Sequence, residues 1–312
     1  MNLRLSSGPH IHTTHDTQDL MRTVLISLVP PAAAGIYLYG FNAALLLAIS
    51  VATCVLSEYV WQRLCHKPVR VGDLSAAVTG AILALNLPSG APWWMPVVGG
   101  VFATILVKQL FGGIGCNFLN PAITARAVLL VSWPAYMSTY AQPERTFFTP
   151  FTDAFTGATP LRAPSVFSTM DLFLGNIPGS IGETCKFAIL LGLAILLISG
   201  VVRWHVPVIF TLTVGVMTLI FSGNAQEALN AMLSGGVLFG AVYMATDYVT
   251  NPMLIAGKCI FAFGCGAIVV LIRCFGGYPE GVTFAIMMMN ILTPLIDRVT
   301  KRRIFGEVKQ NA

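Results

Sequence analysis

The chain has 312 residues, of which 55% are hydrophobic and only 10% charged, with a formal net charge of +5. A soluble domain carries about 25% charged residues, because a surface in water must be polar. This composition excludes a water-soluble protein, a disulfide-rich secreted scaffold, a disordered chain and a nucleic-acid-binding protein, and it predicts an integral membrane protein. The positive charge is weak evidence for any partner, since membrane proteins collect Lys and Arg in cytoplasmic loops.

Ten stretches of the chain are predicted to be membrane-spanning helices, because each approaches the roughly 20 mostly apolar residues that a span requires. They lie near 20–38, 41–61, 74–88, 93–110, 120–137, 181–200, 206–222, 228–246, 252–273 and 281–297. Residues 1–19 are polar, so we expect no cleavable signal peptide and expect the first span to direct insertion. The segment 138–180 is too long for a simple turn, and it separates the first five spans from the last five.

The Lys and Arg residues near the span ends predict the orientation of the chain. With the N-terminus in the cytoplasm, the outer side holds Arg145, Arg162, Lys186 and Arg273. The inner side holds a larger set: Arg4, Arg63, Lys67, Arg70, Lys108, Arg203, Arg298, Lys301, Arg302, Arg303 and Lys309. We therefore expect cytoplasmic tails at 1–19 and 301–312 and an outer loop at 138–180.

Two sequence matches at one spacing indicate an internal repeat. The string at 107–113, which contains Phe-Gly-Gly, matches the string at 271–277, and the same shift of 164 positions pairs Pro88 with Pro252. Each half then holds five spans, and an odd number of spans gives the two halves opposite orientations. The sequence therefore predicts an all-α integral membrane protein with about ten transmembrane helices in two inverted five-helix repeats.

The two repeats, 20–137 and 181–300, also predict where a site lies. In inverted-repeat folds, sites tend to sit where the halves meet and where helices break near the middle of the membrane. The span at 74–88 is short, and its counterpart is followed by Asp247 and Pro252, which suits broken helices. Gly and Pro are also simply common in membrane helices, so both interpretations stay open.

The cysteines and histidines do not indicate a metal site. No two of the seven cysteines form Cys-x-x-Cys and most lie in apolar spans, so the ligand spacing of zinc and iron–sulfur sites is absent. A cluster completed by a partner's cysteines stays open as an alternative. His10, His12 and His15 lie in the polar tail with no further ligand nearby, and we interpret them as solvated. We expect no metal ion in this chain.

Ionisable residues inside predicted spans are costly and often functional. Most of them lie close enough to a span end for the side chain to reach water: Glu58, Lys108, Glu183, Lys186, Lys258 and Arg273. Arg126 and Asp247 are the better candidates for buried roles. Asn117, Asn120 and Pro121 predict a polar helix N-terminus, whose free N–H groups suit an anion or a ligand carbonyl.

The outer loop, 138–180, contains the most distinctive string of the chain. Its five prolines mark it as a loop and not a missed span. Inside it lies Asp-Ala-Phe-Thr-Gly-Ala-Thr-Pro-Leu, from Asp153 to Leu161. The part Thr-Gly-Ala-Thr-Pro alone is typical of a turn. With Asp153 ahead of it, however, the string displays the Thr159 hydroxyl beside small residues, so that a bulky group can approach it.

This string resembles the flavinylation motif Asp-x-x-Thr-Gly-Ala-Thr, in which a flavin transferase attaches FMN through its phosphate to the last threonine. Further strings are similar to the family that contains the D subunit of the bacterial Rnf complex and the B subunit of the Na⁺-translocating NADH:quinone reductase. They lie at 7–10, 72–80, 85–88, 111–122, 245–252 and 273–281, and so cover nearly the whole chain. Thr156, where the quinone-reductase relative tends to have Ser, and the absence of a longer N-terminal region favour the Rnf branch.

The resemblance implies a redox-driven translocase subunit that passes electrons between reduced ferredoxin and NAD⁺, coupled to Na⁺ or H⁺ translocation. Thr159 would carry FMN by a phosphoester bond, with Asp153 and Gly157 in the recognition motif. A second flavin, riboflavin, would bind without a covalent bond, at a place that no local motif identifies. The implied fold is the five-plus-five inverted repeat of urea channels, which agrees with the repeat in the sequence.

The same resemblance implies a location and partners. The chain would lie in the bacterial cytoplasmic membrane, in contact with lipid, with the flavin loop on the outer face. Its partners would be the other Rnf subunits, both membrane subunits and peripheral flavin and iron–sulfur subunits, and a flavin transferase during maturation. The flavin would supply the redox chemistry, so no side chain is assigned a catalytic role.

Two rival functions have to be weighed against electron transfer. A channel or facilitator could share the inverted-repeat fold without redox activity, since fold does not fix function. It would be a colourless protein with a continuous polar pore. A purely structural membrane anchor would leave the string at 153–161 unexplained.

Overall fold

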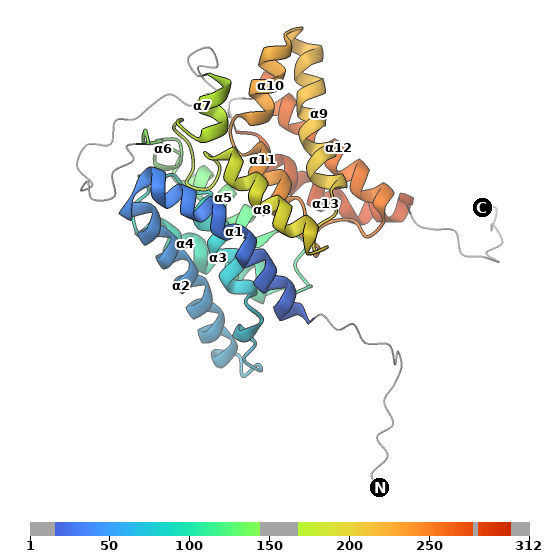
Figure 1. The fold of residues 1–312 in the computed structure, drawn as a ribbon. Helices are drawn as coiled ribbons and strands as arrows, with labels where there is room; N and C mark the ends of the chain where they lie inside the picture. The colour runs from blue at the N-terminus through green and yellow to red at the C-terminus, as the bar shows by residue number, and fades with distance from the viewer. Residues whose placement is uncertain (1–15, 144–167, 277–279, 301–312) are drawn as a thin grey trace, which may run out of the picture.

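The computed structural model describes residues 16–143, 168–276 and 280–300, and helices make up most of these ranges (Figure 1). Within them no β-strand occurs, and the isolated bridge between Pro88 and Ser180 is a single pair. The prediction of an all-α protein is therefore confirmed for the part of the chain that the structure describes.

The first half of the chain contains three long or buried helices followed by shorter ones. They are α1 (Thr17–Tyr39), α2 (Phe41–Leu64), the 3₁₀ turn η1 (Val71–Asp73), α3 (Ser75–Leu85), α4 (Trp94–Val101), the π-helical η2 (Phe102–Gln109), α5 (Pro121–Ser132) and α6 (Pro134–Met137). One residue, Gly40, separates α1 from α2. Its φ of 69° is unfavourable for any residue with a Cβ atom, so glycine permits this sharp reversal.

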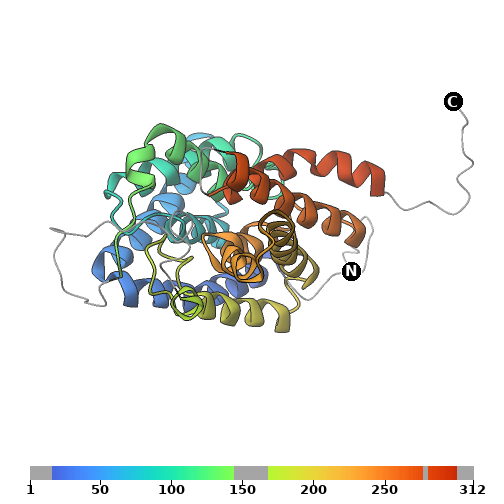
Figure 2. The ribbon, with the colours of Figure 1, turned by 90° about the horizontal axis from the view of Figure 1, so that it is seen from above.

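The second half has a similar order of elements. They are α7 (Thr169–Leu174), α8 (Lys186–Ile198), α9 (His205–Ser222), α10 (Ala225–Leu233), α11 (Val237–Phe239), the π-helical η3 (Gly240–Met244), α12 (Ile255–Phe275) and α13 (Val282–Thr300). Seen from above, the two halves lie beside each other, with the first half in blue to green and the second in yellow to red (Figure 2).

Five of the described helices are long and apolar enough to cross a membrane: α1, α2, α9, α12 and α13. Shorter apolar helices are α3, α4 continued by η2, α5 and α8. The chain is therefore a multi-pass membrane protein. Every predicted span overlaps helical residues, although the number of crossings stays a prediction.

Two predicted spans are not single helices, and the expectation of continuous helices there is wrong. In 228–246, α10 ends at Leu233, and Gly235 takes a φ of 62° before α11 begins. In 120–137, α5 ends at Ser132 because Trp133 precedes a proline, and the ring of that proline disfavours helical backbone at the residue before it. With the shift of 164 positions, α3 corresponds to 239–249, so the break at Gly235 lies just before its counterpart, and the helix of that counterpart ends at Met244, ahead of Asp247.

The core of the molecule is the short helix α3 and the elements that surround it. Nearly all of its side chains are buried, including Leu83 and Leu85. It packs closely on α2 at Gly80, where an added Cβ would lie 2.7 Å from the Cα of Val51. Elsewhere α1 packs on α8 and α5 on α13, so both contacts join the two halves. A buried site between these contacts would therefore be lined by both halves.

Candidate functional site

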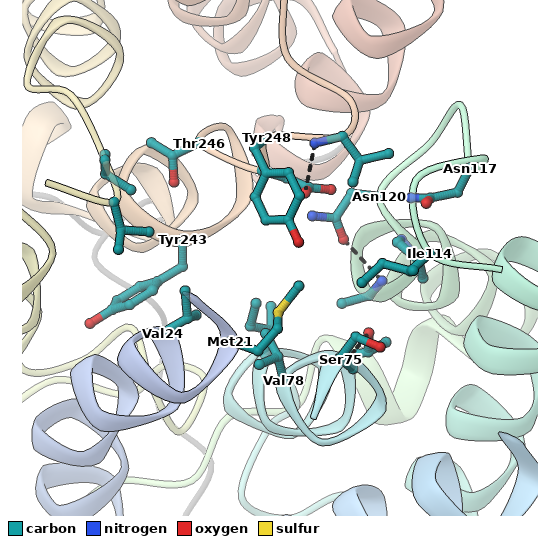
Figure 3. A pocket seen from close by; sticks show the side chains of 18 of the residues that line it. Met21, Val24, Ser75, Val78, Ile114, Asn117, Asn120, Tyr243, Thr246 and Tyr248 are labelled. Carbon is teal, nitrogen blue, oxygen red and sulfur yellow. Dashed lines mark hydrogen bonds between the residues drawn. The ribbon is translucent and has the colours of Figure 1, made fainter. Parts of the chain in front are cut away.

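A cavity of about 100 Å³ lies between the two halves of the chain (Figure 3). One wall is apolar and comes from α1 and α3, with Met21, Val24 and Val78. The opposite wall comes from η3 and the loop after it, with Tyr243 and Thr246. In the topology that the sequence predicts, this cavity is near the cytoplasmic side, because α1 begins there.

The N-terminus of α5 forms one polar side of the cavity. The Oδ1 atom of Asn120 caps this helix by accepting the N–H groups of Ala122, at 3.0 Å, and Ile123, at 3.4 Å. Pro121 at the first helical position needs no partner for its nitrogen. The amide nitrogen of Asn120 points toward Tyr248 on the other side of the cavity (Figure 3). The polar N-terminus predicted at Asn117, Asn120 and Pro121 is therefore present and lines the cavity.

The loop after η3 supplies Asp247 and Tyr248. Asp247 accepts the N–H of Val249 and the hydroxyl of Thr250, each at 3.3 Å. Burial raises the pKa of the Asp247 carboxyl. Burial and this carboxylate together raise the pKa of Tyr248 to about 12, so its hydroxyl keeps its proton near neutral pH and can donate a hydrogen bond. The prediction that Asp247 has a buried role is confirmed in part, because the residue is only half-buried.

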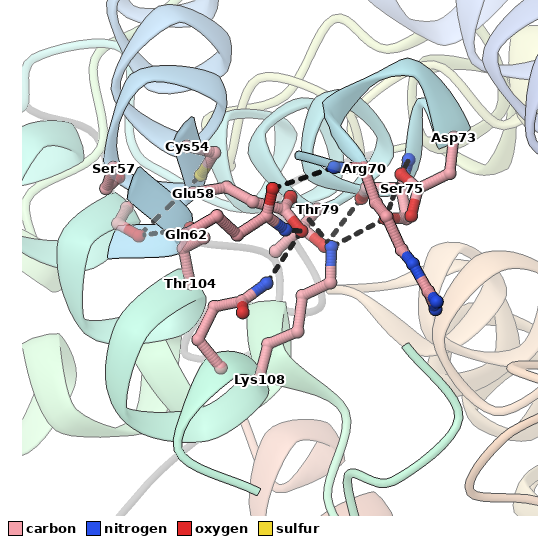
Figure 4. Close-up of polar contacts among 12 residues, drawn as sticks. Cys54, Ser57, Glu58, Gln62, Arg70, Asp73, Ser75, Thr79, Thr104 and Lys108 are labelled. Carbon is pink, nitrogen blue, oxygen red and sulfur yellow. Dashed lines mark hydrogen bonds and ion pairs between the residues drawn. The ribbon is translucent and has the colours of Figure 1, made fainter. Parts of the chain in front are cut away.

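A buried ionic network, which we call the inner network, adjoins the cavity at Lys108 (Figure 4). Lys108 Nζ donates to Glu58 Oε2, at 2.9 Å, and to Ser75 Oγ, at 2.5 Å. The other oxygen of Glu58 accepts Gln109 Nε2, at 2.7 Å, and Gln62 Nε2, at 3.1 Å. Each carboxylate oxygen of Glu58 therefore has a donor.

A second ionic network, which we call the outer cluster, contains Asn86, Arg126, Glu183 and Glu280. Arg126 on α5 is only 2% exposed, so its predicted buried role is confirmed. Its Nη1 atom donates to Asn86 Oδ1, at 3.1 Å, and its Nη2 atom donates to Glu280 Oε2. Glu183 Oε2 lies 4.0 Å from the same Nη2 atom. The cluster thus joins α5 of the first half to the segments before α8 and α13.

The expectation that the other ionisable residues reach water is wrong for several of them. Glu58 and Lys108 pair with each other, and both are almost fully buried. Lys186 is fully buried, and its ammonium donates to the main-chain carbonyls of Glu183 and Gly235. The distance of a residue from a span end did not predict its exposure, because a long side chain near an end can also turn inward to a buried acceptor.

The residues singled out in the outer loop, Asp153, Gly157 and Thr159, lie outside the described residues, so their role stays a prediction. His10, His12 and His15 also lie outside them. In the described ranges, no group of three or more His, Cys, Asp or Glu side chains is placed to hold a metal ion.

Comparison with known proteins shows the family of this chain. The model of the family described as NQR2, RnfD, RnfE matches residues 4–306. The chain belongs to this family. The motifs at 111–122 and 245–252, on which the resemblance depended, line the cavity with Asn117, Asn120 and Asp247.

Curated relatives match the chain from end to end. It is 46% identical to the D subunit of the Na(+)-translocating ferredoxin:NAD(+) oxidoreductase complex of Acetobacterium woodii, over 99% of this chain and 97% of the relative. It is 37% identical to the D subunit of the proton-translocating ferredoxin:NAD(+) oxidoreductase complex of Clostridium ljungdahlii, over 97% and 96%. It is 35% identical to the D subunit of the ion-translocating oxidoreductase complex of Halorhodospira halophila, over 99% and 97%. These names confirm the predicted family. They also confirm the prediction that its members are subunits of redox-driven translocases.

Proposed function

We propose that the chain is the electron-transfer membrane subunit of an ion-translocating ferredoxin:NAD⁺ oxidoreductase of the Rnf type. The observation that carries this proposal is the end-to-end match to D subunits of complexes that are named for that reaction. The partners are then the other subunits of the complex, and the location is the bacterial cytoplasmic membrane. The relatives differ in the ion that their names give, so we propose Na⁺ or H⁺ as the translocated ion.

We further propose that Thr159 carries FMN through a phosphoester bond. The support is the string from Asp153 to Thr159, in which the small residues Gly157 and Ala158 precede the acceptor threonine. A flavin transferase would recognise this string during maturation. In the predicted topology the loop is on the outer face, where a covalent bond would keep the flavin from diffusing away.

The cavity between the halves is our proposed place for the second flavin, riboflavin. A flavin ring needs apolar walls and a few donors for its carbonyl groups, and this cavity offers both; at about 100 Å³ it would have to widen to admit the whole ring. Val24 and Val78 supply apolar surface, and the Asn120 amide and the Tyr248 hydroxyl supply donors. The bound flavin would supply one-electron chemistry, while the N-terminus of α5 would favour negative charge on the ring.

The ten-helix inverted repeat is also proposed, and the helix bounds support it. A shift of 164 positions carries Phe41, the first residue of α2, to His205, the first residue of α9. The same shift carries α5 to 285–296, inside α13. The two contacts α1–α8 and α5–α13 each join elements that correspond in this way, as a two-fold axis between the halves would require.

A denaturing gel tests the covalent flavin. The chain made together with a flavin transferase should show fluorescence in the gel, and Thr159→Val should abolish it. Thr149→Val is the matched control, because Thr149 lies in the same loop but outside the string, and it should leave the fluorescence unchanged. Fluorescence that survives in Thr159→Val would contradict the assignment of Thr159. A colourless wild-type protein would favour the channel or facilitator.

A further inference from the structure

The outer cluster contains two carboxyl groups that approach each other. Glu183 Oε2 and Glu280 Oε2 both face the Nη2 atom of Arg126, the first at 4.0 Å and the second as a hydrogen-bond acceptor. Glu183 Oε1 accepts the main-chain N–H of Ser180, at 3.1 Å, and its hydroxyl, at 3.0 Å. Glu183 Oε2 is buried and has no hydrogen-bond donor among the described residues. It is the one carboxylate oxygen in the described part of the chain that is both buried and without a donor.

A proton between the two carboxyl groups would supply the missing donor and remove the repulsion between them. A buried carboxylate oxygen without a donor is costly, and two adjacent carboxylates repel each other. One shared proton gives Glu183 Oε2 a donor and removes the repulsion, as in other pairs of acids that titrate together. Burial and the negative charge of Glu183 accordingly raise the pKa of Glu280.

The groups that face this pair favour a proton over a metal cation. Arg126 on α5 donates to Glu280, and Lys186 on α8 donates to the carbonyl of Glu183. Arg273 on α12 donates to the carbonyls of Ala231 and Ser234, and its positive charge lowers the pKa of Glu280. The phenol of Tyr140 faces them from the segment after α6. A hard metal cation needs about six oxygen ligands, and three cationic side chains would repel it.

The pair is held from both halves of the chain. The segment that carries Glu183 is fixed by the N–H of Ile181, which donates to Leu87 at 3.1 Å, and by that of Gly182, which donates to Leu85 at 2.7 Å. Glu280 precedes α13 and accepts a hydrogen bond from Arg126 on α5, so the first half contacts both members of the pair.

We propose that Glu183 and Glu280 form a proton-binding pair, separate from the cavity, at the junction of the two halves. Uptake of one proton forms one O–H bond, converts one carboxylate to a carboxyl group, and changes the charge of the pair from −2 to −1. Release of the proton reverses this change. The inference uses only residues of the outer cluster, and it stands whether or not Thr159 carries a flavin.

Infrared spectroscopy of the purified complex tests the proposal. Wild type should show a carbonyl band of a protonated carboxyl group that shifts in ²H₂O and declines as the pH is raised through about 7, the raised pKa of Glu280. Glu183→Gln and Glu280→Gln should each remove that band. Glu227→Gln is the matched control, because Glu227 is an exposed glutamate on α10, and it should keep the band.

A second measurement needs no variant at all. Glutamate labelled with ¹³C at the side-chain carboxyl should lower the frequency of the same band in wild-type protein. The proposal is overturned if wild type has no such band, or if both Gln variants keep it with an unchanged midpoint. Displacement of the band by Na⁺ at constant pH would also overturn it, because the pair would then bind a metal cation.

Discussion

The inner network and the outer cluster lie at opposite ends of α3, and both bury glutamates beside a cation. At the start of α3, the two oxygens of Glu58 receive donors from Lys108, Gln62 and Gln109. Beyond its end, Glu183 has one oxygen that receives two donors from Ser180 and another that receives none. The two sites share burial and charge, and they differ in whether the hydrogen bonds are complete.

This difference separates a structural ion pair from a site that changes its protonation. A complete buried network resists change, because removing any member leaves a charge without a partner. An incomplete network leaves a carboxylate oxygen to which a proton can bind without breaking an existing hydrogen bond. We therefore expect substitutions in the inner network to act on stability, and substitutions of the carboxyl pair to act mainly on proton binding.

Removal of Lys108 should have the largest effect on stability. Lys108→Met leaves Glu58 as a buried charge without its cation, which typically costs about 3–5 kcal/mol. Chemical unfolding of the purified complex in mixed micelles should show this loss. The double variant Glu58→Gln/Lys108→Met, which removes both charges, should recover much of it. An unchanged unfolding midpoint in Lys108→Met would show that the inner network is not a structural ion pair.

The sequence predicted the helices better than it predicted these two networks. Apolar length alone located the helical stretches, because each span must satisfy its own backbone in lipid. The break at Gly235 could not be placed, since glycine occurs in membrane helices with and without a break. The capped N-terminus at Asn120 was readable because the cap and its helix are adjacent in the chain.

The partners of the buried charges had no local signal. Glu58 and Lys108 are 50 positions apart, and Arg126 and Glu280 are 154 apart, so only the packing of the helices brings them together. Charge and position alone suggested that most of these side chains reach water. The flavinylation string at 153–159 is the opposite case, because all of its residues are consecutive.

Substitution of Asn86 in the outer cluster should cause a loss of stability of intermediate size. Asn86→Ala removes the acceptor of Arg126 Nη1, and a lost hydrogen bond to a charged group costs about 1.5–3 kcal/mol. Asn86→Asp keeps an oxygen acceptor for the guanidinium and should lose less stability. The same unfolding measurement compares the two variants. Both variants also lose the hydrogen bond from Asn86 Nδ2 to the carbonyl of Ile82, so equal losses would mean that this bond, and not the contact with Arg126, accounts for the effect.

Glu183→Gln should have the smallest effect on stability, although the residue is as deeply buried as Glu58. The side-chain oxygen of the introduced glutamine can keep the donors of Ser180, and its amide can donate to Glu280 in place of the shared proton, so we expect a change within about 1 kcal/mol. Glu58→Gln, by contrast, leaves Lys108 without its counter-charge and should cost clearly more. Unfolding midpoints of the two variants, measured side by side, check this order. If Glu183→Gln is the more damaging change, its carboxylate is fully ionised and structural, and the distinction between the two ends of α3 fails.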